Sequence, residues 1–81
     1  MAVYPNPVAD IVNIEYQIQA FATVKFEIYS MTGARVIAST AYTKPIGEFT
    51  EMLSVGTLLP GMYVLKITVD GAPQMHRITV Q

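Results

Sequence analysis

Hydrophobic and polar residues alternate along most of this chain. In Asp10–Ile18 every second residue from Val12 onward is apolar, and the positions between them carry asparagine, glutamate and glutamine. A period of two places successive side chains on opposite sides of an extended strand, so this segment is predicted to be a half-buried strand. Thr23–Ser30 repeats the pattern, and we expect three of its side chains to face the core: Val24, Phe26 and Ile28.

The middle of the chain predicts two more strands and a loop. Arg35–Tyr42 alternates less sharply but is still expected to be extended. A short strand is predicted over Glu48–Ser54, with one face formed by Phe49, Glu51 and Leu53. Val55–Gly61 contains two glycines and a proline, so we expect a loop there, with Leu58 or Leu59 filling the core.

Near the N-terminus two prolines flank an asparagine in the segment YPNPV. Proline fixes its own φ and disfavours helical backbone at the residue before it, so Tyr4 and Asn6 are expected to be extended or in a turn. We predict a stiff lead into the fold. We also expect Pro5 and Pro7 to prevent the first strand from pairing further upstream.

The last twenty residues carry the clearest pattern. Asp70 and Gly71 lie between two alternating segments, and this dipeptide favours a two-residue type I′ turn because both turn residues need positive φ. The register then places Leu65 opposite His76, whereas a four-residue loop would shift the partners and keep the faces. One face is expected to hold Tyr63, Leu65, Ile67, Val69, His76, Ile78 and Val80, and the other Met62, Val64, Lys66, Met75, Arg77 and Thr79.

Together these segments predict an all-β protein, a small antiparallel β-sandwich of about six to seven short strands with an immunoglobulin-like arrangement. The 81 residues make one domain, and 52% hydrophobic against 14% charged residues exclude a disordered tail. Because the chain has no cysteine, neither a disulfide nor a thiolate metal site can supplement its core.

Charge and composition exclude several function classes. The net charge is −1 and the five basic residues are scattered, so no nucleic-acid partner is expected. The apolar runs are far shorter than a membrane helix needs, so we expect no membrane insertion. His76 is interpreted as a partly covered histidine with one hydrogen-bond partner, and no metal or other cofactor is expected. No serine lies in a nucleophile elbow, so no enzymatic activity is expected.

Two groups of polar and aromatic residues have alternative interpretations. The six carboxylates are interpreted mostly as solvated outward positions, with Glu51 facing inward near an edge. Tyr29 and Tyr42 suit strand positions, and stacking on sugars is the alternative.

Three segments, taken in order, resemble the C-terminal sorting domain of the type IX (Por) secretion system. The first is a Pro-Asn-Pro entry into an alternating strand, carried by Pro5, Asn6, Pro7, Val12 and Ile14. The second is IY-x-x-x-G-x-x-V, carried by Ile28, Tyr29, Gly33 and Val36. The third is L-x-x-G-x-Y-x-L-x-I, carried by Leu58, Gly61, Tyr63, Leu65 and Ile67. The family closes on a basic residue before a short apolar strand, matched by Arg77, Ile78 and Val80.

This resemblance covers nearly the whole chain and implies a non-catalytic secretion signal. It implies that residues 1–81 form the C-terminal sorting domain of a longer secreted protein. Such domains direct cargo from the periplasm across the outer membrane to the cell surface or the medium. The implied partners are the translocon, its shuttle proteins and a sortase-like enzyme that commonly removes the domain after export.

We expect the translocon to recognise the terminal hairpin, through Lys66, Met75, Arg77, Ile78, Thr79 and Val80. The outward side of this hairpin mixes apolar and basic groups, which suits docking of a partner. The alternative is that this side packs against another part of the sandwich. A homodimer through an exposed edge strand is also expected. The alternative function is an immunoglobulin-like adhesion or carbohydrate-binding module of a secreted enzyme, with an aromatic platform or a site on its loops.

Overall fold

The computed structural model describes residues 1–81 and contains eight strands and no helix. The all-β antiparallel sandwich expected from the alternation is confirmed. The strands are β1 (Ala2–Tyr4), β2 (Ile11–Ile18), β3 (Ala22–Ser30), β4 (Arg35–Ala38), β5 (Tyr42–Lys44), β6 (Gly47–Ser54), β7 (Gly61–Val69) and β8 (Ala72–Val80).

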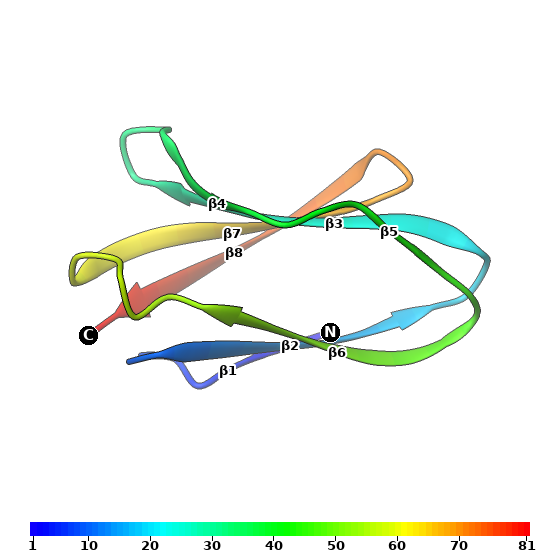
Figure 1. Cartoon of the computed structure of the whole chain (residues 1–81), viewed down its shortest axis with the longest axis horizontal. Coiled ribbons are helices and arrows are strands. Elements are labelled where there is room, and N and C mark those ends of the chain that lie inside the picture. The colour runs from blue at the N-terminus through cyan, green and yellow to red at the C-terminus, as the bar shows by residue number, and fades with distance from the viewer.

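The strands form two sheets that pack face to face (Figure 1). Sheet A has the order β1–β2–β6, and sheet B has the order β4–β3–β7–β8, with β5 also paired to β3. Figure 1 shows sheet B as the upper layer and sheet A as the lower layer. The long edge strands are therefore β6 in sheet A and β8 in sheet B.

One hydrophobic core lies between the sheets and contains 16 buried residues. The sides of β2 and β3 that were predicted to face inward are buried, and Phe26 is fully inaccessible to solvent. The Tyr16 ring packs edge-on against Phe26, with ring centroids 5.4 Å apart. Each such side chain contributes about 1.5–3 kcal/mol to the free energy of unfolding through its burial.

The strand predicted over Glu48–Ser54 and the loop after it are confirmed. On β6, Leu53 is buried and Phe49 and Glu51 are half-buried on the same side. In the following loop Leu58 packs against the core, whereas the Leu59 side chain is 79% exposed. The Tyr63 hydroxyl donates a hydrogen bond of 2.6 Å to the Leu59 carbonyl and ties this loop to β7.

The expectation that the prolines prevent pairing upstream of the first strand is wrong. Residues Ala2–Tyr4 pair with β2 as strand β1, with Tyr4 opposite Asn13. The chain turns directly after β1, and the peptide bonds before Pro5 and Pro7 are both cis. The prolines therefore separate two paired strands of sheet A.

The single strand predicted over Arg35–Tyr42 is also wrong, because the chain forms β4 and β5 there. Both strands pair with β3, and Ser39 lies between them. The Ser39 amide donates to the Phe26 carbonyl at 2.8 Å, and the Ser39 hydroxyl accepts from the Phe26 amide at 3.0 Å. One serine thus satisfies both backbone groups of Phe26 where the regular ladder is interrupted.

No helix in the structure is long and apolar enough to cross a membrane.

Candidate recognition surface

The terminal hairpin of β7 and β8 has the register predicted from the sequence. Leu65 lies opposite His76, and Val69 lies opposite Ala72, as a two-residue loop requires. Asp70 and Gly71 have φ of 48° and 82°, so both turn residues have the positive φ of a type I′ turn. The faces of the hairpin are therefore assigned as expected.

The structure divides the six residues that were predicted to contact the translocon into two groups. Ile78 and Val80 are 1% and 2% exposed and belong to the core. Their side chains pack inside the sandwich, so they cannot touch a partner of the folded domain. The other four face away from the core on the outer side of sheet B: Lys66, Met75, Arg77 and Thr79.

This outer side does not pack against another part of the sandwich. Met75 is 63% exposed and Met62 is 46% exposed. A shallow hollow of ≈ 370 Å³ lies over β3, β7 and β8 and the turn after β3. Its lining is mostly apolar and consists of Tyr29, Ser30, Met31, Gly33, Val64, Lys66 and Met75.

Cations and apolar groups alternate around the hollow. Val64 lies opposite Arg77, and Lys66 lies opposite Met75, in the register of β7 and β8. The two cations therefore occupy one diagonal of a four-residue square, and the two apolar side chains occupy the other. Diagonal neighbours across a strand pair are roughly 7–8 Å apart, within reach of one partner segment.

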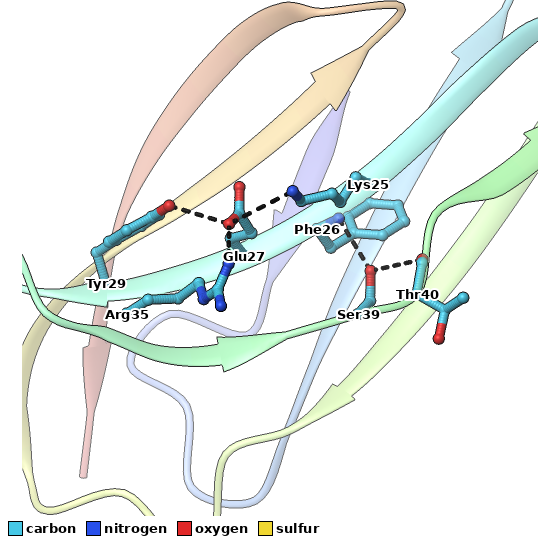
Figure 2. A network of polar contacts seen from close by, with 7 residues as sticks. All are labelled: Lys25, Phe26, Glu27, Tyr29, Arg35, Ser39 and Thr40. Atoms are coloured by element: carbon cyan, nitrogen blue, oxygen red, sulfur yellow. Dashed lines mark hydrogen bonds and ion pairs between the residues drawn. The ribbon is translucent and has the colours of Figure 1, made fainter.

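The carboxylate of Glu27 is the centre of a polar network beside the hollow (Figure 2). Its side chain was interpreted as solvated, and this is wrong, because Glu27 is only 4% exposed. Its Oε2 accepts a 3.0 Å hydrogen bond from the Tyr29 hydroxyl and a 3.2 Å hydrogen bond from Arg35. Lys25 lies 3.8 Å from the same oxygen atom.

These contacts keep Glu27 ionised despite its burial. Burial by itself raises the pKa of the Glu27 carboxyl, because it disfavours the charged form. Hydrogen bonds from Tyr29 and Arg35, together with the charges of Lys25 and Lys66, outweigh burial and lower this pKa below its ordinary value. The hydrogen bond to Glu27 raises the pKa of the Tyr29 hydroxyl, so that side chain stays protonated and donating.

Charge is segregated between the outer faces of the two sheets. Four of the five basic residues lie on the outer face of sheet B: Lys25, Arg35, Lys66 and Arg77. The only carboxylate on that face, Glu27, is buried beneath them. The outer face of sheet A instead carries exposed Glu15 and Glu48. The hollow therefore lies within a basic, partly apolar surface.

The Pro-Asn-Pro segment binds directly to the last strand. The Asn6 side chain accepts a 3.0 Å hydrogen bond from the Thr79 amide and donates one of 3.2 Å to the Arg77 carbonyl. Val8 donates to the Thr79 carbonyl at 2.8 Å and accepts from the Gln81 amide at 2.8 Å. Figure 1 shows the C-terminal end of β8 beside the start of β2. The segment thus covers the end of β8 with four hydrogen bonds.

The remaining candidate residues do not form a common site. His76 is half-buried on the core side, as expected, but its ring has no hydrogen-bond partner in the protein. Tyr42 lies opposite the inward-facing Val24, whereas Tyr29 lies on the outer face, so the two rings make no shared platform for a sugar. No three His, Cys, Asp or Glu side chains lie together as metal ligands would.

Two functional features of this surface escaped sequence reasoning. Glu27 follows the same alternation as solvated residues, and its burial depends on neighbours from three strands. Asn6 binds Arg77 and Thr79, which lie 71 and 73 positions further along the chain, so no local sequence pattern indicates these hydrogen bonds. The one available signal for Asn6 was its position between two prolines, where the backbone is held extended.

Comparison with known proteins identifies this domain. Residues 2–81 match the family described as secretion system C-terminal sorting domain. No curated protein and no solved structure matches the chain. Because the match covers all but the first residue, the chain belongs to the family of type IX secretion system C-terminal sorting domains, non-catalytic signals that direct a protein across the outer membrane to the cell surface or the medium.

Proposed function

We propose that the secretion machinery reads this sorting domain through the outer face of the terminal hairpin. The observation that carries the proposal is a methionine-lined hollow that Lys66 lines, with Arg77 opposite its lining residue Val64, on the face that holds four of the five basic residues. Methionine adapts its shape to irregular apolar partners, and unpaired cations steer an acidic partner. Lys66, Met75 and Arg77 are the contact residues, with Thr79 beside them.

The arrangement favours a partner segment that presents carboxylates beside an apolar side chain. The carboxylates would bind Lys66 and Arg77, and the apolar group would enter the hollow between Val64 and Met75. Ile78 and Val80 support recognition indirectly, because their burial holds β8 in place. Removing the last residues of the chain would therefore unfold the domain as well as remove contacts, and it cannot separate the two roles.

We further propose that residues 1–81 form the C-terminal domain of a longer secreted protein. In this proposal the translocon and its shuttle proteins recognise the domain, and a sortase-like enzyme removes it after export. We also propose a homodimer through an exposed edge strand. The β6 edge supports this last proposal, since it is eight residues long and contains no proline or lysine to discourage pairing.

Export of a reporter fused to the domain tests the recognition surface. Lys66→Glu with Arg77→Glu should lower export by ~10-fold or more, because like charges then face the acidic partner. The matched control is Glu15→Lys with Glu48→Lys, which reverses two charges on the outer face of sheet A and should leave export unchanged. Urea unfolding of both variants checks that each is folded.

Two results would have different meanings. If the double glutamate variant folds and is exported normally, the hairpin face is not the recognition surface. If a fusion lacking the whole domain is exported equally well, the chain does not act as a signal in that host.

A further inference from the structure

The long edges of the two sheets differ in how their backbone groups are covered. Edge strands expose unpaired N–H and C=O groups that can pair with another chain, and proteins usually shield them. β1, β4 and β5 are edges of only three or four residues. β6 and β8 are eight and nine residues long and need more shielding.

The edge of β8 is covered along its second half. Hydrogen-bonding groups alternate between the two sides of a strand in an antiparallel ladder. The N–H and C=O of Thr79 bind Asn6 and Val8, so they point away from β7. The same groups of Met75 and Arg77 therefore point to this open side, and Asn6 also binds the Arg77 carbonyl. Only the Pro73 carbonyl, the two groups of Met75 and the Arg77 amide remain open.

Residues 5–8, which cover the end of β8, do not themselves form a new exposed edge. Pro5 and Pro7 have no N–H group, so neither can donate to another strand. At the other end of β8, Pro73 lacks a donor as well. The open part of β8 is thus too short to pair with a full strand while Asn6 is in place.

The edge of β6 is open along its whole length. The Val55 amide binds the Asp10 carbonyl on the side of β2. By alternation, the backbone groups of the even-numbered residues point away from β2: Glu48, Thr50, Met52 and Ser54. None of these groups takes part in a backbone hydrogen bond outside the sheets.

We propose that Asn6 and Val8 guard the edge of β8 against pairing with β6 of a second copy of this chain. The two edges are complementary in an antiparallel register that places Arg77 opposite Glu48, because both residues direct their backbone groups to the open side. Met75 then lies opposite Thr50, and no like charges face each other. The guard covers the Arg77 carbonyl and both groups of Thr79, so such a pairing can use only the Pro73 carbonyl, the groups of Met75 and the Arg77 amide while Asn6 is in place.

The pairing that the guard prevents is head-to-tail. It joins two different surfaces, so each added copy leaves another β6 edge open and growth does not close on itself. Asn6 is the sensitive residue. Without its side chain the Arg77 carbonyl and the Thr79 amide become free, whereas the Thr79 carbonyl stays bound to the Val8 amide. The open run of β8 then extends through both groups of Arg77 to the Thr79 amide.

The experiment compares the mass of the unaltered domain with that of Asn6→Ala by light scattering after gel filtration at about 100 µM. Asn6→Ala should raise the average mass about twofold or more above the unaltered domain. Asn13→Ala is the matched control, because Asn13 also donates to a backbone carbonyl, that of Tyr4 at 3.3 Å, but lies on a central strand. It should leave the mass unchanged.

A second variant tests whether β6 is the partner edge. Thr50→Pro places a ring where the Thr50 amide points to solvent and blocks any pairing through the β6 edge, so Asn6→Ala with Thr50→Pro should have the mass of Thr50→Pro alone. Hydrogen exchange at the Thr79 amide shows whether Asn6→Ala has opened the edge. An opened edge without a mass increase overturns the proposal, as does a mass increase that Thr50→Pro does not reverse. If the Thr79 amide stays protected from exchange in Asn6→Ala, Asn6 is not the residue that guards the edge.

Discussion

The outer faces of sheets A and B follow the same alternation but are organised differently. On sheet A, polar side chains make separate contacts at the surface, such as the 3.1 Å hydrogen bond from Gln17 to Glu48. On sheet B, side chains from β3 and β4 converge on the buried carboxylate of Glu27. A polar position in a strand therefore becomes solvated or buried according to the length and charge of its neighbours across the sheet.

We expect the largest effect from removing the Glu27 carboxylate, which should lower the free energy of unfolding. Glu27→Ala should lower it by about 1–3 kcal/mol, because hydrogen bonds to a buried charged group are worth more than exposed ones. Glu15→Ala on the outer face of sheet A is the control and should have a smaller effect. Urea unfolding measures both, and equal losses would mean that the two faces do not differ energetically.

The free energy of unfolding should depend on pH because of the same Glu27 carboxylate. Because its pKa is lower in the folded than in the unfolded chain, Glu27 contributes stability that is complete above the ordinary glutamate pKa. This contribution is lost as the pH falls through the lowered pKa of the folded state. The stability difference between the unaltered domain and Glu27→Gln should therefore shrink on acidification. A difference that stays constant with pH would contradict this origin.

The smallest effect on the free energy of unfolding is expected from Lys25, at the exposed edge of the Glu27 network. Lys25 lies 3.8 Å from Glu27 and its side chain is 42% exposed. Lys25→Met should lower the free energy of unfolding by about 0.2–1 kcal/mol, and less at high salt, because exposed ion pairs are weak and screened. Unfolding in low and high salt measures this. A loss as large as that of Glu27→Ala would show that Lys25 belongs to the centre of the network.

Local signals were sufficient for the hairpin and insufficient for contacts that join distant segments. The turn at Asp70 and Gly71, the inward side of β6 and a core position at Leu58 or Leu59 were all predicted, since each depends on spacing or turn geometry within a few residues. Strand β1 was missed because its pairing with β2 crosses the prolines.

The recognition surface was predicted only in outline for a related reason. Alternation already placed Ile78 and Val80 on the face opposite the outward hairpin residues, so including them among the contact residues went against that pattern. Alternation within the hairpin could not show that Arg35 comes from another strand to the same outer face. The hollow beside Met75 also depends on how the turn after β3 lies relative to β7 and β8, and no spacing rule gives that arrangement.

The bridge between Val8 and Val80 has a consequence for biosynthesis. It joins residues from the two ends of the chain, so a nascent polypeptide that stops before Val80 leaves its first strands without their last partner. Contacts between such distant residues form late, because the whole intervening chain must first be ordered. The domain can therefore mature only after the ribosome has added the last strand, and a prematurely terminated product would lack a properly folded export label.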